Sequence, residues 1–525
     1  MGGSTMPGSG KSTDRSFRRT RKTGWAIVLA LLGIGAVILV QGQPGMIPVN
    51  AAASCTSSAP ASAAYTVTVC FSSPTDASSL SGDTTVSATT SVTGTNPGVQ
   101  RLVYYLDGAY LLTDYSSPFQ FTLPTANWVD GAHTLAVEAD MRDDFVSSQA
   151  AVQVDFVNGV STPPSNSNSF TPTGGTLPGN GSPLVLAAVG DGASGEANAA
   201  KVTSMIASWN PNLFLYLGDV YEKGSPTEFL NWYGGSTQFY GQFRSITDPT
   251  IGNHEYTNKQ APGYFNYWDN IPNYYSFDSG GWHFISLNAN PQFNQTAPGT
   301  AQYQWLVQDL AANHAACTLA YWHEPLFNIG QEPAATNVQA IWSLLAQSGV
   351  DIVLNGHDHD YQRWLPLDGS GLPATPGMTE FVVGTGGHGV QTFVQSDARV
   401  AQAFDSNTSP APFGALRLSL SASSAAFAFI NTSGTVLDAG TIPCQNAGGV
   451  TPIPTATATA IPPTHTPTPT HIPPTNTPTP SPLPATATPT DTPLPPPSTP
   501  TAQPTARSGQ PLLIHLPLIQ NGPMP

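Results

Sequence analysis

The chain has 525 residues, a length that accommodates two or three domains and the linkers between them. Only 9% of the residues are charged, the formal net charge is −16, and 49 glycines and 51 prolines indicate extensive loops and linkers. An acidic surface repels nucleic acid and anionic membranes, so it excludes binding that depends on a basic surface, and an anionic substrate would need a local positive feature.

Residues 1–53 have the layout of an export signal. A basic stretch, residues 15–22, precedes an apolar run, residues 25–40, and then three alanines, Ala51, Ala52 and Ala53. The apolar run is long for a signal and short for a membrane span, which needs about 20 residues. We therefore expect a secreted or cell-surface protein, with an uncleaved N-terminal membrane anchor as the alternative.

The four cysteines, Cys55, Cys70, Cys317 and Cys444, allow three disulfide pairings in an exported chain. Pairing Cys55 with Cys70 is the most local choice. It would leave Cys317 to pair with Cys444 and tie the end of a later domain back to its core. No two cysteines form a C-x-x-C pair, so we see no structural zinc or redox motif.

Residues 54–158 read as an all-β module. Short β-rich runs recur between turn signals such as Asp107-Gly108 and Asp130-Gly131, a spacing that fits a small β-sandwich. The runs are residues 65–70, 84–92, 100–106, 119–123, 133–139 and 150–156. The stretch Tyr104-Tyr105-Leu106-Asp107-Gly108 resembles the immunoglobulin-like modules of bacterial exported proteins. A spacer is the expected role, and carbohydrate or cell-wall binding is the alternative.

Residues 159–183 are uncharged and rich in Ser, Thr, Pro, Asn and Gly, which predicts a linker. From residue 184 to 446, strand-like and helix-like patterns alternate, which predicts an α/β domain. The expected strands are residues 184–189, 213–217, 282–287, 318–321, 351–354 and 379–383, and the expected helices are residues 196–209, 303–310 and 338–346. After Ala415, two or three β runs are expected to complete the sheet.

Two further segments end the chain. Residues 447–508 are Thr/Pro-rich, and because proline disfavours helix and sheet we expect a disordered, extended stalk. Residues 509–525 form an apolar tail whose apolar run is too short to span a membrane. Both ends of the chain offer a route to association with the cell envelope.

Metal-ligand side chains follow the strand-like runs of the α/β domain. They are Asp191, Asp219, Asn253 with His254, His323, and His357 with His359. Functional groups gather at the carboxyl ends of strands in open α/β sheets, and side chains at i and i+2 of extended backbone point the same way. A mixed oxygen and nitrogen set suits Zn, Mn or Fe better than Ca.

These motifs occur in the order Gly190-Asp191, Gly218-Asp219, Gly252-Asn253-His254-Glu255, His323-Glu324-Pro325 and Gly356-His357-Asp358-His359. The series resembles the calcineurin-like metallophosphoesterases, and the stretch through Arg363 resembles their purple-acid-phosphatase branch. The resemblance implies an α/β fold of the metallophosphoesterase type. In that fold, a four-layer αββα sandwich would follow the immunoglobulin-like β-sandwich and precede the stalk.

The resemblance also implies roles for individual residues. Asp219 would bridge two divalent or mixed-valence metal ions of Fe, Zn or Mn. Asp191 and His359 would hold the first ion. Asn253, His323 and His357 would hold the second, with Asn253 also near the substrate. His254 would contact the phosphate and protonate the leaving oxygen.

Three further residues have expected positions near this site. The purple branch places a tyrosine ligand three residues after the bridging aspartate, whereas Tyr221 lies two after Asp219. A one-residue deletion in that loop would explain the difference and still allow Tyr221 to bind the first ion, so Tyr221 is a candidate ligand. His388 follows a Gly-rich turn and is expected to line the substrate pocket. Arg363 is expected to brace its loop through an ion pair.

The expected function is that of an exported binuclear-metal phosphohydrolase, in which a metal-bound hydroxide attacks a small phosphate ester. A phosphomonoesterase of the acid-phosphatase type is the first choice, with His254 and Asp219 as catalytic residues. A phosphodiesterase or nucleotidase with the same metals is the alternative within the class. A cell-surface adhesion or scaffold protein with an inactive phosphoesterase fold is the alternative from another class.

Overall fold

The computed structural model describes residues 54–162, 165–179, 182–257 and 260–446. The expected export signal or anchor, the Thr/Pro-rich stalk and the apolar tail lie outside these ranges. Within these ranges, no helix combines the length and the apolar character that crossing a membrane requires. The two described domains belong to one compact unit.

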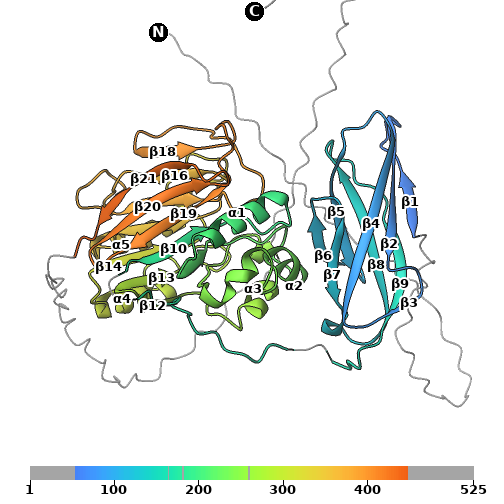
Figure 1. Ribbon diagram of the computed structural model, residues 1–525, viewed down its shortest axis with the longest axis horizontal. Coiled ribbons are helices and arrows are strands. Elements are labelled where there is room, and N and C mark those ends of the chain that lie inside the picture. Colours follow the sequence, from blue (N-terminus) through green and yellow to red (C-terminus); the bar gives the residue numbers. More distant parts are fainter. Residues whose placement is uncertain (1–53, 163–164, 180–181, 258–259, 447–525) are drawn as a thin grey trace, which may run out of the picture. The chain divides into compact units, whose positions relative to one another are not determined.

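The first domain is a β-sandwich of two sheets (Figure 1). The four-stranded sheet has the order β1 (Cys55–Ser58), β2 (Tyr65–Ser73), β4 (Asp83–Gly94), β7 (Gln120–Pro124). The five-stranded sheet has the order β3 (Ser78–Leu80), β9 (Ala150–Phe156), β8 (Gly131–Met141), β5 (Val99–Leu106), β6 (Ala109–Asp114). All six expected strands are confirmed, and β1, β3 and β6 are additional.

The sandwich core follows from the two-residue period of its strands. In β2, Tyr65, Val67, Val69 and Phe71 are buried while the residues between them are more exposed. The Asp107–Gly108 turn joins β5 to β6, and both residues have positive φ, as a two-residue hairpin turn of this hand requires.

The second domain contains two sheets. The five-stranded sheet has the order β11 (Leu213–Tyr216), β10 (Leu184–Val189), β19 (Gly414–Leu420), β20 (Ser424–Asn431), β21 (Val436–Pro443). The seven-stranded sheet has the order β12 (Tyr275–Ser279), β13 (Trp282–Ser286), β14 (Cys317–Tyr321), β15 (Ile352–Asn355), β17 (Thr379–Val383), β16 (Tyr361–Trp364), β18 (Val400–Phe404). The runs after Ala415 thus join β10 and β11 in a sheet of their own.

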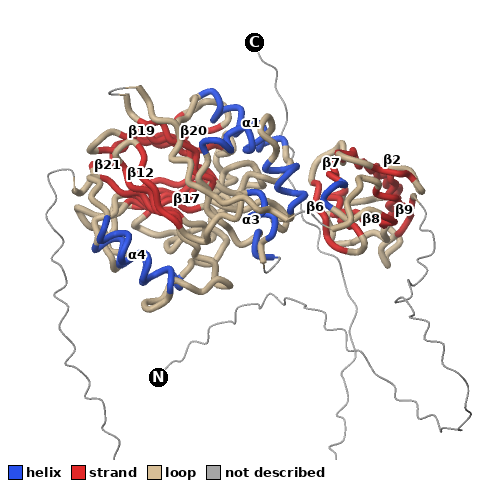
Figure 2. The backbone as a smooth tube through the Cα atoms, turned by 90° about the horizontal axis from the view of Figure 1, so that it is seen from below, coloured by secondary structure: helices blue, strands red, loops and turns tan. Residues whose placement is uncertain are grey.

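Helices lie outside these sheets (Figure 2). The α-helices are α1 (Ala197–Ser208), α2 (Pro226–Glu228), α3 (Pro262–Tyr267), α4 (Ala301–Ala312) and α5 (Gln339–Gln347). Other helical turns of the second domain are η2 (Phe229–Tyr233), η3 (Phe239–Ile246), η4 (Glu255–Thr257) and η5 (Thr336–Val338), and η1 (Thr125–Asn127) lies in the first domain. Helix α1 contacts β19, whereas α4 and α5 share an apolar cluster with the outer side chains of β13 to β15. The inner side chains of both sheets form a separate core, so the expected four-layer αββα fold is confirmed.

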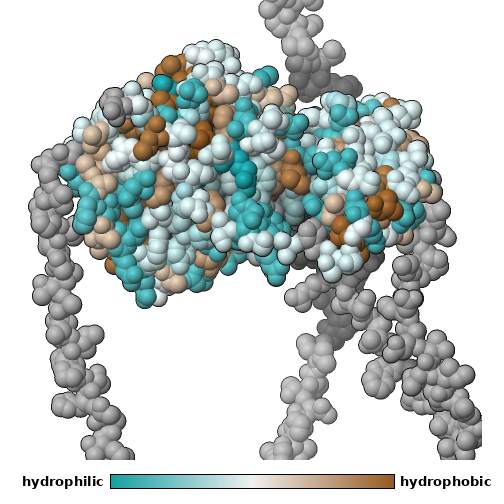
Figure 3. Space-filling view, turned by 60° about the horizontal axis from the view of Figure 1, so that its bottom comes forward, coloured by the Kyte–Doolittle hydropathy of each residue, from teal (hydrophilic) through white to brown (hydrophobic). Residues whose placement is uncertain are grey.

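The face of the described residues drawn in Figure 3 is mostly polar. On the face drawn in Figure 3, hydrophobic side chains occur in separate groups among hydrophilic ones. The segment between the domains follows the second domain closely, because Thr173 and Gly174 donate backbone N–H groups to the buried Asp248 carboxylate at 2.7 and 2.9 Å. This segment therefore leaves the first domain and is held against the second.

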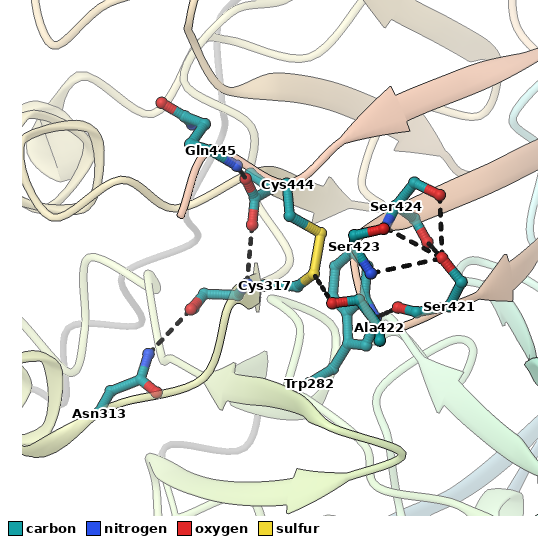
Figure 4. Close-up of a disulfide and its surroundings, with 11 residues drawn as sticks. Trp282, Asn313, Cys317, Ser421, Ala422, Ser423, Ser424, Cys444 and Gln445 are labelled. Carbon is teal, nitrogen blue, oxygen red and sulfur yellow. Dashed lines mark hydrogen bonds between the residues drawn. A yellow bond between two sulfur atoms is a disulfide. The ribbon is translucent and has the colours of Figure 1, made fainter. Parts of the chain in front are cut away.

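Both disulfides have the pairing preferred from the sequence. Cys55 pairs with Cys70 across the neighbouring strands β1 and β2, and Cys317, the first residue of β14, pairs with Cys444, just after β21 (Figure 4). The second disulfide therefore joins the seven-stranded sheet to the five-stranded sheet. A hydrogen bond of 2.7 Å from the Trp282 indole to the Ser421 carbonyl links the sheets at the same place.

Removing the Cys317–Cys444 bond in a Cys317→Ala/Cys444→Ala variant should lower the free energy of unfolding of the second domain by about 5 kcal/mol, because the bond closes a long loop of the unfolded chain. Chemical denaturation measures this loss. The matched Cys55→Ala/Cys70→Ala variant opens a shorter loop in the other domain and should cost about 3 kcal/mol. Equal unfolding midpoints for wild type and the first variant would contradict the expectation.

Glu380 in β17 makes stability depend on pH. Burial raises the pKa of its carboxyl from the ordinary 4.5 to about 8. The folded protein therefore keeps this proton at pH values where the unfolded chain has lost it, and stability falls as pH rises from about 5 to about 8. Relative to wild type, Glu380→Gln should gain about 1 kcal/mol per pH unit across that window. Urea unfolding at several pH values tests this, and a constant difference would refute it.

Candidate metal centre

Polar side chains from both sheets meet at the carboxyl ends of parallel strands. Asp191 follows β10 and Asp219 follows β11, which are parallel neighbours in the five-stranded sheet. His323 follows β14, and His357 and His359 follow β15, which are parallel neighbours in the seven-stranded sheet. The expected gathering at strand ends is therefore present, with each sheet supplying part of the set.

Asn253 and His254 reach the centre from an irregular segment. This segment runs beside β11, where the N–H of Thr250 donates to the Tyr216 carbonyl at 2.9 Å. The backbone N–H of His254 then donates to Asp219 Oδ1 at 2.9 Å. Glycine is needed at the neighbouring position, because a Cβ at Gly252 would collide with the Asp219 carboxylate.

One half of the centre is built around the Nε2 atom of His323. This atom lies 3.1 Å from Asp219 Oδ2 and 3.1 Å from Asn253 Oδ1. Ligand atoms of Asp219, His323 and His357 all lie within 4.8 Å of one another. The structure therefore brings together the three residues predicted to hold the second ion, beside the predicted bridging carboxylate.

The other half contains Asp191, His359 and Tyr221. The Tyr221 hydroxyl lies 2.9 Å from Asp191 Oδ1 and 2.8 Å from His359 Nε2, and His359 Nε2 lies 3.7 Å from Asp191 Oδ1. Asp191 Oδ1 is also 4.0 Å from His323 Nε2, which joins the two halves. The shortened loop therefore still places Tyr221 among the predicted ligands of the first ion.

Backbone carbonyls orient the imidazoles. Nδ1 of His323 lies 2.7 Å from the Leu217 carbonyl, and Nδ1 of His359 lies 2.9 Å from the Gly389 carbonyl. Because a carbonyl only accepts, Nδ1 carries a proton in each ring, and Nε2 is the nitrogen that faces the centre. Ligating histidines in metalloproteins are oriented in the same way.

Three of these residues adopt backbone conformations that side chains normally avoid. Asp191, Asp219 and His357 have φ values of 59°, 67° and 76°. Non-glycine residues pay of order 1 kcal/mol or more for such conformations, which concentrate at functional sites. The turns after β10, β11 and β15 thus give up stability to aim these side chains at one point.

The buried charges of the centre compensate one another. Burial raises the pKa of Asp191 to about 7, although His323 opposes this effect. Burial would also raise the pKa of Asp219, but the charges of His323 and His254 outweigh it and lower that pKa. Burial lowers the pKa of His357 to about 3 and of His359 to about 4, so both rings are neutral, as metal ligation requires.

These observations fit a pair of metal ions. The donors are carboxylates, one amide oxygen and imidazole Nε2 atoms, a set suited to Zn, Mn or Fe. The residues that would hold the ions are Asp191, His359 and Tyr221 on one side, Asn253, His323 and His357 on the other, and Asp219 between them. The individual ligand roles stay predictions.

His254 and His388 lie beside this set. Nδ1 of His254 is 2.7 Å from the Glu222 carbonyl, and its Nε2 is 3.8 Å from Asp219 Oδ2. His388 is bonded through Nδ1 to Glu196 at 2.6 Å, and its ring stacks on Tyr221 with 4.1 Å between centroids. Both rings are therefore placed to meet a molecule that enters the centre.

The structure adds Glu255, to which the sequence analysis assigned no role. Its buried carboxylate accepts the N–H groups of Val220 at 2.8 Å, Gly252 at 2.9 Å and Asp219 at 3.3 Å. It thereby fixes the turn that carries Asp219 against the turn that carries Asn253. The sequence signal for this role was its position directly after Asn253-His254.

The predicted brace at Arg363 is confirmed by an ion pair of 2.6 Å with Asp438.

Replacing Glu255 by alanine should weaken metal binding about 10- to 100-fold, because the two turns lose their common acceptor. Calorimetric titration of residues 54–446 with Zn²⁺ or Mn²⁺ measures this. Glu380→Ala is the matched control, since it removes another fully buried glutamate, and neither of its carboxylate oxygens is hydrogen-bonded to a predicted ligand. Equal affinities for the Glu255 variant and wild type would show that Glu255 does not position the ligands.

Comparison with known proteins agrees with this geometry. Residues 185–361 match the calcineurin-like phosphoesterase family, and residues 68–137 match the bacterial Ig domain family. Purple acid phosphatase 15 of Arabidopsis thaliana is 38% identical over 96 residues, which are 17% of this chain and 18% of that protein. Probable purple acid phosphatase 20 of the same plant is 26% identical over 204 residues, 35% of this chain and 47% of that protein.

The similarity covers only part of each relative. The chain spans less than half the length of these two plant proteins. Among solved structures, the purple acid phosphatase PPD1 of yellow lupin (Lupinus luteus) seeds has a TM-score of 0.43 and 15% identity, covering 74% of this chain and 81% of that one. The chain thus contains a calcineurin-like phosphoesterase domain, with purple acid phosphatases among its homologues, behind a bacterial Ig domain.

Proposed function

We propose that this protein hydrolyses phosphate monoesters at a binuclear metal centre in the second domain. The observation that carries the proposal is the convergence on one buried point of Asp191, Asp219 and three histidines from the strand ends of two sheets, together with Asn253 from an irregular segment. Two cations held there would lower the pKa of a shared water and neutralise charge on the phosphate.

The chain's own residues would bind and orient the ester. The ring of His254 is about one-quarter exposed, so it faces both the centre and an incoming phosphate. Burial would lower the pKa of His254, but the charges of Asp219 and Glu222 outweigh it and raise that pKa. His254 therefore favours its protonated form, which can donate to the leaving oxygen. His388 is held by Glu196 and stacks on the Tyr221 ring, and it would contact the ester from that side of the centre.

We further propose that the protein works outside the cytoplasm on a small phosphate ester. Two disulfides support an oxidising compartment. The net charge of −16 disfavours nucleic acid as a partner. The N-terminal segment and the stalk are the proposed means of association with the cell envelope.

Assay of residues 54–446 with p-nitrophenyl phosphate and added Zn²⁺, Mn²⁺ or Fe tests the proposal. We expect turnover in the wild type, no turnover in Asp219→Ala, and a kcat about 100-fold lower in His254→Ala. His283→Ala is the matched control, because this histidine is bonded to Asp278 and Asp309 and belongs to no predicted ligand set.

Two outcomes would contradict the proposal. Wild-type turnover no greater than that of Asp219→Ala, with less than one metal ion per chain, would leave an inactive scaffold as the better interpretation. Faster hydrolysis of bis-p-nitrophenyl phosphate than of the monoester would identify a diesterase instead.

A further inference from the structure

A fully buried carboxylate lies where the two domains meet. Glu228 in α2 belongs to the phosphoesterase domain and has no exposed surface. Its carboxylate accepts the N–H groups of Lys223 at 3.0 Å and Ser225 at 2.9 Å from its own loop. It also accepts the Tyr110 hydroxyl from β6 of the Ig module. Burying a carboxylate is costly unless donors surround it, and this one takes part of its set from the other domain.

Further polar contacts join the same two surfaces. Ser225 Oγ donates to the Leu111 carbonyl at 2.6 Å, and the Trp232 indole donates to the Thr113 carbonyl at 2.8 Å. Asn231 exchanges two hydrogen bonds with the backbone of Thr122, at 2.8 and 2.9 Å. Trp232 is only 6% exposed. If the linker alone joined the two domains, the polar groups on these surfaces would be accessible to water. Instead, these polar groups are hydrogen-bonded to one another across the domain boundary.

A second contact leads from the Ig module to the metal centre. The Tyr115 hydroxyl donates to the Glu222 carboxylate, and the Arg101 guanidinium lies 3.2 Å from that hydroxyl and 3.5 Å from the carboxylate. Glu222 is the residue whose carbonyl orients His254. The Tyr115 ring also packs edge-on against His388, with 5.0 Å between centroids.

We propose that the Ig module is docked permanently on the phosphoesterase domain through Tyr110 and Tyr115, and that this docking holds the 221–228 loop in the position that orients His254. Tyr115 is hydrogen-bonded to Glu222 near the start of the loop, and Tyr110 is hydrogen-bonded to Glu228 at its end. Tyr221, a predicted metal ligand, and the acceptor for His254 both lie on this loop. The module is then a positioning element of the centre in place of the spacer expected from the sequence.

The docking is tested without any assay of activity. A specific protease site inserted after Thr162, in the exposed start of the linker, allows the two domains to be separated covalently. After cleavage of the wild type, we expect residues 54–162 to co-elute with the phosphoesterase domain on gel filtration. A Tyr110→Phe/Tyr115→Phe variant removes only two hydroxyls and should release at least half of the module under the same conditions.

The matched control is Tyr105→Phe, whose hydroxyl bonds Glu138 within the Ig module. It should co-elute like the wild type. Separation of the cleaved wild-type domains would overturn the docking. If the double variant retains the module as well as the Tyr105 variant does, the hydroxyls of Tyr110 and Tyr115 do not contribute to the docking.

The effect on His254 rests on the proposed phosphatase function and is read separately. We expect Tyr115→Phe to lower kcat about tenfold with little change in KM, because the proton donor is misaligned while the metal ligands are intact. In a His254→Ala background the same substitution should have no further effect, as expected for residues that act as a unit. An additive loss would overturn the link to His254. If the wild type hydrolysed no phosphate ester, the phosphatase function would be refuted. The docking would still be tested by the co-elution experiment, which needs no activity.

Discussion

The buried carboxylate of Asp219 is the constraint on which the site depends. A negative charge without solvent is stable only if donors and positive charge surround it. His323 supplies charge at 3.1 Å, the backbone of His254 supplies a donor, and Glu255 holds the turn from behind. One contact comes from the end of β14 in the seven-stranded sheet, and the other two come from the irregular segment that carries His254 and Glu255. The fold therefore has to bring both sheets to one point before this aspartate can be buried.

The two-sheet architecture meets that requirement. Asp191 and Asp219 follow β10 and β11, and His323 and His357 follow β14 and β15. The core between the sheets holds these strand ends in register, and the Cys317–Cys444 bond joins the sheets at another place. Small displacements of one sheet against the other would separate carboxylates from imidazoles. The packing of the core between the sheets therefore also maintains the geometry of the site.

The Ig domain enters this arrangement through the loop between Tyr221 and Glu228. That loop contributes a hydroxyl to the centre, a carbonyl to His254 and a buried acid to the domain boundary. Its few residues serve both the metal centre and the neighbouring domain. Glu228 is buried although it carries a carboxylate, because it accepts hydrogen bonds both from its own loop and from Tyr110 of the Ig domain.

The sequence by itself determined six strands of the first domain, six strands and the runs after Ala415 of the second, three of its helices, a preferred pairing of the cysteines, and the group of residues that meet at the centre. Those features follow from local periodicity and from the rule that parallel strands gather their ends on one side. Only the tertiary structure decided that β19 to β21 join β10 and β11 in a separate sheet, that Glu255 ties two turns together, and that Tyr115 reaches Glu222 from another domain. These contacts join residues far apart in the chain, and no periodicity within a segment records which distant segment it will pack against.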